Sequence, residues 1–269
     1  MAPATTRRTI FDQVARDYDE VRPGYPTALI DDIIVMSALP EDGKILEIGC
    51  GTGQATLPFA ERGYALVCLD IGAELAAIAR AKCQPYPNVR IDTVAFESWA
   101  PEEQAFDLVI SATAFHWIPP EIGYPKVAQM LKPSGCMAIF ANLHPTPHTG
   151  FFQEVQKVYR RVLPEWRDPS SAPPTEERIR ATEAPIKHTG LFDKVLVQRY
   201  PWSQDYTREQ YLKLLNTYAD HQGLEEDRRL RLFRGIGEVI DHEFGGKITR
   251  PYLAVLYLAQ KKVEALPTA

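Results

Sequence analysis

One short stretch of the chain combines an acid with closely spaced glycines. In ILEIGCGTGQAT, residues 45–56, Glu47 precedes Gly49, Gly51 and Gly53. Glycines let the backbone turn at positive φ and approach a ligand closely, and a helix that follows offers free N–H groups. Such a turn is typical of a nucleotide site. A carboxylate aimed at it would repel a pyrophosphate but suits a ligand that carries an ammonium or sulfonium group.

The spacing of the glycines separates two classes of nucleotide site. In dinucleotide-binding turns the third glycine follows the second by three positions, whereas Gly53 follows Gly51 by two. This spacing and Glu47 argue against an NAD-dependent oxidoreductase. Asp70 would fit a ribose in either class of protein, so that alternative stays open. The alternatives without a ligand are a glycine turn with a structural role only, a buried acid at Glu47 that is satisfied by the protein, and a helix cap at Asp70.

These residues need a strand before the turn and a helix after it, and the chain repeats that pattern. We expect strands at 44–49, 64–70, 89–96, 106–113 and 135–142, and helices at 52–63, 72–83 and 122–132. Short apolar strands that alternate with helices imply parallel βαβ units. The strands are nearly continuous apolar runs, as expected when helices cover both faces of a sheet.

The chain after residue 142 is less regular. We expect helices at 151–163, 208–221 and 225–244, strands at 192–203 and 249–262, and a Pro/Ser-rich connector at 167–177. Ligands bind parallel α/β sheets beyond the carboxyl ends of the strands, so these helical stretches are candidates for a substrate cover.

Composition limits the classes of partner. The chain has 269 residues, 45% of them hydrophobic, and a formal net charge of -5. This mild acidic surplus favours neither nucleic acid nor an anionic membrane as a partner. No apolar run approaches the roughly 20 residues of a membrane span, and the N-terminus lacks the apolar core of a secretory signal. We therefore expect a cytoplasmic protein.

The cysteines do not indicate a metal site. Cys50, Cys68, Cys83 and Cys136 show no CxxC spacing and have no adjacent histidine. We expect reduced thiols that pack in the interior and no metal ion.

The motifs, taken in order, resemble those of the class I S-adenosylmethionine-dependent methyltransferases of the small-molecule type, with a methyltransferase domain 11 or 25. Glu47 to Gly53 match motif I, and Asp70 ends the second strand. The further matches are AFESW (95–99), FDLVISATAFHWI (106–118), LKPSGCMAIF (131–140) and the N-terminal YDEVRPGYP (18–26). The resemblance covers about residues 10 to 142, and the ordered set is much more specific than motif I alone.

The resemblance implies S-adenosylmethionine as cofactor and S-adenosylhomocysteine as product. Asp70 would accept hydrogen bonds from both ribose hydroxyls, and Arg22 would bind the carboxylate of the methionyl moiety. Ala95 stands where many members carry an Asp, so adenine recognition would rest on the Phe96 N–H, on Glu97 or on water. The implied cofactor-binding residues are Tyr18, Arg22, Tyr25, Glu47, Gly49, Cys50, Gly51, Gly53, Asp70, Ile71, Ala95, Phe96, Glu97, Ser111, Ala112 and Phe115.

The acceptor side is less defined. His116 is the candidate general base, and the alternative is that it lines the cofactor or packs. Trp117, Trp202, Tyr218 and His221 are candidates for a substrate lid. Core packing is the alternative for these four residues and for Phe96 and Phe115, and a surface ion pair with Asp19 or Glu20 is the alternative for Arg22.

Together these observations predict one α/β domain over residues 1–269. It would hold a Rossmann-like, seven-stranded doubly wound sheet with an antiparallel terminal hairpin and helical insertions forming a lid. An N-terminal lid segment (1–37) would precede the cofactor-binding core (38–142), and 143–190 and 203–248 would cover the substrate site. The expected activity is methyl transfer to an O, N or C nucleophile of a small molecule, by a monomer or homodimer without metal, membrane or nucleic acid. The alternatives are an NAD-dependent oxidoreductase and a non-catalytic S-adenosylmethionine-binding protein.

Overall fold

The computed structural model describes residues 10–100, 103–145, 149–166 and 173–263. The chain forms two units, each with its own interior. Unit 1 comprises Met1–Pro23, Leu143–Arg178 and Pro201–Leu253, and unit 2 comprises Gly24–Asn142, Ile179–Tyr200 and Ala254–Ala269. Unit 2 contains the glycine turn and the strands expected around it. Unit 1 gathers segments from three separate parts of the chain.

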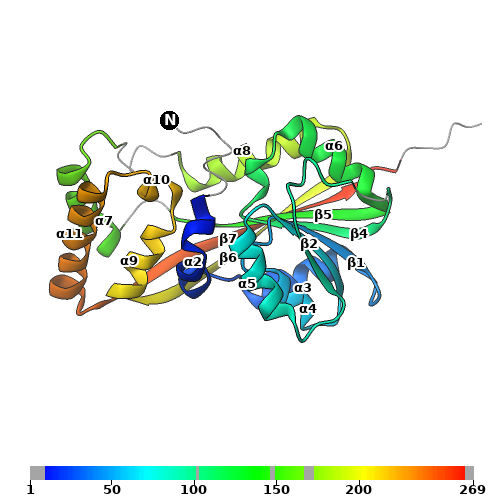
Figure 1. Cartoon of the computed structure of the whole chain (residues 1–269). Helices are drawn as coiled ribbons and strands as arrows, with labels where there is room; N and C mark the ends of the chain where they lie inside the picture. Colours follow the sequence, from blue (N-terminus) through cyan, green and yellow to red (C-terminus); the bar gives the residue numbers. More distant parts are fainter. Residues whose placement is uncertain (1–9, 101–102, 146–148, 167–172, 264–269) are drawn as a thin grey trace, which may run out of the picture. The chain divides into compact units, whose positions relative to one another are not determined.

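A seven-stranded sheet of order β3-β2-β1-β4-β5-β7-β6 confirms the expected fold class (Figure 1). Pairing is parallel between β1 and β2, β1 and β4, β2 and β3, and β4 and β5. The sequence order reverses at β1, which lies between β2 and β4, and ligands bind α/β sheets at such a point. The strands are β1 (Lys44–Ile48), β2 (Ala65–Asp70), β3 (Val89–Thr93), β4 (Phe106–Ala112), β5 (Leu131–Leu143), β6 (Phe192–Thr207) and β7 (Lys247–Lys261).

Helices cover both faces of the sheet in unit 2. Figure 1 shows α3 (Thr27–Met36), α4 (Thr56–Ala60) and α5 (Ala73–Cys83) on one side, and α6 (Pro120–Met130) on the other. Each long helix turns one apolar stripe inward, as amphipathic helices on a sheet do. The buried residues of α3 are Leu29, Ile30 and Ile33, and those of α5 are Leu75, Ala76, Ala79 and Cys83.

Several elements differ from the sequence expectations. The helix expected at 52–63 is only Thr56–Ala60, because the glycine turn continues to Ala55. The fifth strand begins at Leu131 rather than 135, and its pairing with β4 is irregular between Phe106 and Leu108. Residues 131–134 thus extend the strand through this irregularity, and Ser134 takes a positive φ there.

Two expectations for the chain after residue 142, a connector and a helix, were wrong in detail. The segment at 167–177 was expected to be a connector, and its residues 167–172 lie outside the described part of the chain. The last residues of this segment belong to a helix, α8 (Thr175–His188). The helix follows two prolines, and proline favours the start of a helix. The helix expected at 208–221 is two, α9 (Arg208–Asn216) and α10 (Ala219–Gln222), because the chain leaves helical geometry at Tyr218.

Unit 1 has a helical and aromatic core. It contains η1 (Ile10–Val14), α2 (Ala15–Val21), α7 (Phe151–Val162), α9, α10 and α11 (Glu226–Phe244). The helices α7 and α11 pack closely where Gly235 meets Val158, since a Cβ at Gly235 would lie 2.7 Å from Val158 Cγ1. Among the described residues no helix is both long and apolar enough to cross a membrane. The buried cluster is Val21, Phe151, Val155, Val158, Leu163, Tyr206, Tyr211, Leu214, Leu215, Leu232, Ile236, Ile240, Ile248 and Tyr252.

Candidate cofactor site

The glycine turn lies directly after β1, at the carboxyl end of the strand. Gly49, Gly51 and Gly53 all have positive φ, at +73°, +56° and +92°. Position 49 requires glycine for two reasons. Its φ is positive, and an added Cβ would collide with the Cβ of Ala114. The turn is fixed to the neighbouring strand, since the N–H groups of Gly49 and Cys50 both donate to the Leu69 carbonyl. The backbone of this turn is thus held where a ligand could approach it closely.

Asp70 connects the glycine turn to the helix after β2. One carboxylate oxygen accepts from the Gly51 N–H at 2.8 Å, and the other accepts from the Gly72 N–H at 2.8 Å. Gly72 is the N-cap of α5. Asp70 therefore joins the glycine turn to the start of this helix.

Glu47 is a fully buried acid with one oxygen left unpaired. Its Oε2 accepts from the Thr56 hydroxyl at 2.6 Å and from the Cys68 thiol at 3.6 Å. Its Oε1 is buried and has no hydrogen-bond partner among the described residues. Desolvation raises the pKa of Glu47 from 4.5 to about 7, against the lowering effect of the hydrogen bonds. The alternative of a satisfied buried acid does not account for Oε1, whereas a cationic donor from a ligand would satisfy it.

The loop after β3 is held in place by a lysine from α6. The Lys126 ammonium donates to the carbonyls of Phe96, Glu97 and Trp99 at 2.7, 3.0 and 2.5 Å. It also lies 5.2 Å from the centroid of the buried Phe96 ring. Glu97 is half-buried, as are Ala95 before the loop and Ile71 after β2. Lys126 was not among the residues expected from the sequence, because no local pattern marks a helical lysine as a loop anchor.

Several expected site residues after β1 and β4 turn their side chains into the core. The Ser111 hydroxyl is buried and donates to the Ile48 carbonyl at 2.8 Å. The Phe115 ring is buried 5.0 Å from the Tyr124 ring. The thiol of Cys50 is buried, and burial raises its pKa. For these three residues the structure favours core packing of the side chain and leaves only backbone groups for a ligand.

His116 and Tyr25 lie at the carboxyl end of β4. His116 is exposed beside Trp117, with 5.0 Å between the ring centroids. Partial desolvation lowers the pKa of His116, so its ring is neutral at pH 7 and can accept a proton. The Tyr25 hydroxyl shares a 2.7 Å hydrogen bond with Thr113, and its ring packs edge-on against Phe140. Ala112, at the end of the same strand, is half-buried.

Comparison with known proteins identifies this arrangement. Residues 45–135 match the model of a methyltransferase domain family. An uncharacterized methyltransferase-like protein of Schizosaccharomyces pombe is 25% identical over 89% of this chain and 88% of its own. A trans-aconitate 2-methyltransferase of Variovorax paradoxus is 29% identical over 46% of each chain. The solved structure of a putative type II methyltransferase from Anaeromyxobacter dehalogenans superposes with a TM-score of 0.60 at 19% identity, covering 89% of this chain and 96% of that one.

Residues 45–135 are a methyltransferase domain, and the matches and the fold support a class I S-adenosylmethionine-dependent methyltransferase. This methyltransferase has its glycine turn, Glu47 and Asp70 in the region that matches the family. The alternative of an NAD-dependent oxidoreductase has no support in these matches. Among the described residues, no cluster of three histidine, cysteine or acidic side chains could hold a metal ion.

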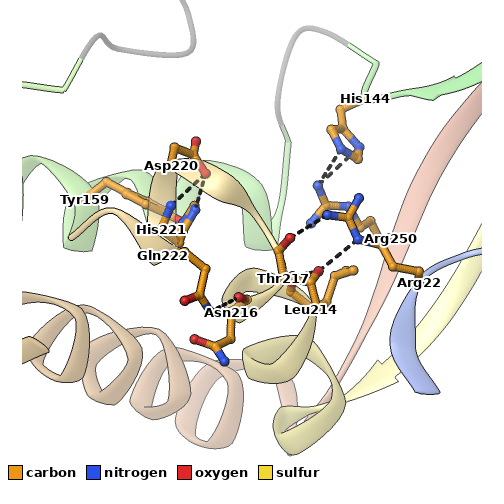
Figure 2. A network of polar contacts seen from close by, with 10 residues as sticks. All are labelled: Arg22, His144, Tyr159, Leu214, Asn216, Thr217, Asp220, His221, Gln222 and Arg250. Atoms are coloured by element: carbon orange, nitrogen blue, oxygen red, sulfur yellow. Dashed lines mark hydrogen bonds and ion pairs between the residues drawn. The ribbon is translucent and has the colours of Figure 1, made fainter. Parts of the chain in front are cut away.

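Most of the remaining expected residues belong to unit 1 of the methyltransferase, and Trp117 belongs to unit 2. Arg22 donates to the Thr217 hydroxyl at 2.9 Å and to the Thr217 carbonyl at 2.7 Å (Figure 2). Its guanidinium lies over the rings of Tyr18 and Tyr218. Trp202 stacks on Tyr252 with 5.0 Å between ring centroids. The roles of Tyr18 and Arg22 at the cofactor, and of Trp117, Trp202 and Tyr218 in a lid, stay predictions.

His221 is part of a buried network of hydrogen bonds in unit 1. Its Nε2 shares a 2.8 Å hydrogen bond with the Tyr159 hydroxyl, and its Nδ1 lies 2.8 Å from an oxygen of Asp220 (Figure 2). His221 itself is 5% exposed. Both ring nitrogens are thus occupied within the protein, which supports the packing alternative for this residue.

Proposed function

We propose that this methyltransferase transfers the methyl group of S-adenosylmethionine to an O, N or C nucleophile of a small molecule and releases S-adenosylhomocysteine. The observation that carries the assignment of the cofactor is the unpaired, buried Oε1 of Glu47 beside the glycine turn. When bound, the cofactor supplies a methyl group activated by a sulfonium. The protein then has to bind the cofactor and the acceptor, align their reacting atoms and exclude water from the site.

The residues of unit 2 divide that work. Glu47 would accept a hydrogen bond from the cofactor's ammonium group, which satisfies Oε1 and stabilises the ionised carboxylate. Asp70 would accept from the ribose while its bonds to Gly51 and Gly72 keep the turn in shape. Lys126 would hold the loop at Phe96 and Glu97 in position for the adenine.

Proton removal from the acceptor is the proposed role of His116. The lowered pKa keeps its imidazole neutral near pH 7. A neutral imidazole serves an alcohol or a carbon acid as a base, whereas a carboxylate or an amine needs no base. The dependence of the rate on His116 would therefore indicate which nucleophile is methylated.

Support for a small-molecule acceptor comes from the relatives and from charge. The Variovorax paradoxus relative is named for trans-aconitate, a small organic acid. The net charge of -5 disfavours a nucleic acid as acceptor. We further propose that the enzyme acts in the cytoplasm, as a monomer or homodimer, without nucleic acid or membrane as a partner.

Calorimetric titration tests the cofactor. The wild-type protein, Glu47→Gln and the matched control Glu61→Gln, whose side chain is exposed on the same unit, are each titrated with S-adenosylmethionine, S-adenosylhomocysteine and NAD. We expect the wild type and Glu61→Gln to bind the first two alike and not NAD. Glu47→Gln should bind about tenfold more weakly, the effect of one charge-assisted hydrogen bond. Binding of NAD alone, or unchanged affinity in Glu47→Gln, would overturn the proposal.

Acceptors are then screened with a labelled methyl donor. Trans-aconitate and related organic acids come first, followed by alcohols and amines of similar size. Label transfer to a small molecule supports the proposal, and transfer only to protein or nucleic acid refutes it.

A further inference from the structure

The strand β7 turns an arginine toward the interior of unit 1. From Lys247 to Tyr252 exposed and buried residues alternate, with Ile248, Arg250 and Tyr252 on the buried side. Alternate residues of a strand point to opposite faces, so Arg250 occupies a position that the pattern reserves for an apolar side chain. It is 7% exposed.

The guanidinium of Arg250 is hydrogen-bonded but not neutralised. Its Nη1 donates to the Tyr211 hydroxyl at 3.1 Å, and its Nη2 lies 2.8 Å from the nearer ring nitrogen of His144 (Figure 2). Its Nε is buried without a hydrogen-bond partner, and within the described part of the chain Arg250 forms no ion pair. A phenol and an imidazole that accept a hydrogen bond carry no negative charge.

Aromatic rings surround this cation. The rings of Phe152, Tyr211, Tyr218 and Tyr252 have their centroids 5.4, 5.6, 5.9 and 5.5 Å from its Cζ. Burial raises the pKa of Tyr211 to about 12, so this phenol stays neutral at physiological pH. The rings attract the cation through their π faces, but they do not supply a counter-charge.

A second arginine contacts the same ring system. The Arg22 guanidinium lies 4.6 Å from the centroid of the Tyr218 ring, the ring that Arg250 also approaches. Arg22 reaches it from the segment after α2, and Arg250 reaches it from β7. Two positive charges from distant parts of the sequence therefore meet one aromatic side chain in unit 1.

A buried cation without an anion is costly to a fold, since desolvation is not offset by an ion pair. Such an arrangement becomes favourable when an anion completes it. The Nε–H and an Nη–H of one guanidinium edge match the two oxygens of a carboxylate. The rings around Arg250 suit the carbon skeleton of an organic acid, which inorganic phosphate lacks.

We propose that Arg250, within its cage of aromatic rings, is a carboxylate-binding site, and that the acceptor of this methyltransferase is an organic acid. The second clause rests on the proposed function, whereas the first does not. The signal for Arg250 in the sequence is a charged residue on the alternating buried face of a predicted strand.

The test is calorimetric titration of the full chain with benzoate, succinate and citrate, and with their methyl esters, which keep the skeleton and lose the charge. The variants are Arg250→Met, Arg250→Lys and the matched control Arg234→Met, which removes an exposed arginine of α11 in the same unit. We expect at least one acid to bind the wild type and Arg234→Met equally, with no binding of its ester. Arg250→Met should bind that acid about 30-fold more weakly or worse, as when one partner of a buried charge pair is truncated.

Arg250→Lys keeps the charge and loses the planar fork, so it should bind with intermediate affinity and covers the case in which Arg250→Met does not fold. No acid binding to the wild type, equal binding of acid and ester, or wild-type affinity in Arg250→Met would overturn the site. Inorganic phosphate that binds as tightly as the acids would overturn its assignment to carboxylates.

Titration of the same preparations with S-adenosylhomocysteine separates this proposal from the previous one. Intact binding of S-adenosylhomocysteine with loss of acid binding in Arg250→Met supports the carboxylate site. Absence of S-adenosylhomocysteine binding in the wild type would refute the proposed cofactor and leave the acid titration as an independent result.

Discussion

The raised pKa of Glu47 predicts a specific dependence of stability on pH. The carboxyl has a pKa of about 7 in the folded protein against 4.5 without its environment. The folded state therefore binds this proton more tightly than the unfolded state. Its contribution to stability is fully present below pH 4.5 and is lost as the pH rises through 7. One pKa unit corresponds to about 1.36 kcal/mol, so the full loss is about 3 kcal/mol.

Replacing Glu47 with glutamine removes this term and little else, because the amide has nearly the same shape. Between pH 5 and pH 8 the wild type loses about 2.5 kcal/mol from this group, and Glu47→Gln does not. At about 2 °C per kcal/mol for a chain of this size, the melting temperature of Glu47→Gln should rise relative to the wild type by about 5 °C over that interval. Other titrating groups cancel in the difference.

Scanning calorimetry of the wild type, Glu47→Gln and Glu61→Gln at pH 5 and pH 8 measures this difference. Glu61→Gln should follow the wild type at both values. A constant offset between Glu47→Gln and the wild type would refute the argument from burial. With saturating S-adenosylhomocysteine the pH-dependent difference should shrink, because the proposed ammonium contact favours the ionised carboxylate.

Three further variants test the supports of the site. Gly49→Ala should cost about 2 to 4 kcal/mol of stability, since it combines a positive φ with a collision at Ala114; a melting temperature within 1 °C of the wild type, about the scatter of neutral changes, would contradict this. Asp70→Ala should weaken S-adenosylhomocysteine binding about tenfold or more without unfolding the protein, and an unchanged dissociation constant would exclude the ribose role. Lys126→Met should weaken binding about threefold to tenfold because three loop carbonyls lose their donor, and unchanged affinity would show that the loop needs no anchor.

The order and type of the central elements could be predicted because each has a local cause. Strands such as Lys44–Ile48 and Ala65–Asp70 are apolar runs, and glycines end the first of them. The positions of Glu47 and Asp70 follow from these strands alone. The spacing of residues in one sequence was therefore enough to predict that the glycine turn, Glu47 and Asp70 lie at the same end of the parallel strands.

The direction of side chains and long-range contacts could not be predicted in the same way. Ser111 and Phe115 stand where the family resemblance expects cofactor contacts, but the neighbouring strand and α6 decide that they face inward. Lys126 and Arg250 act on residues distant in sequence, Lys126 through loop carbonyls almost 30 positions away and Arg250 through His144 and Tyr211. Such contacts depend on tertiary packing, which local patterns do not encode.

The composition of unit 1 from three separate segments has a consequence for synthesis. Its first helix, α2, packs against α9, and the Glu20 carboxylate pairs with the Lys213 ammonium 193 positions later. At about 5 to 20 residues per second on the ribosome, α2 emerges roughly 10 to 40 s before its partner. During that interval Val21, which is buried in the finished cluster, has none of the later helices to cover it. The buried side of this segment, Ala15 and Val21, therefore lacks its packing partners for much of the synthesis of the chain.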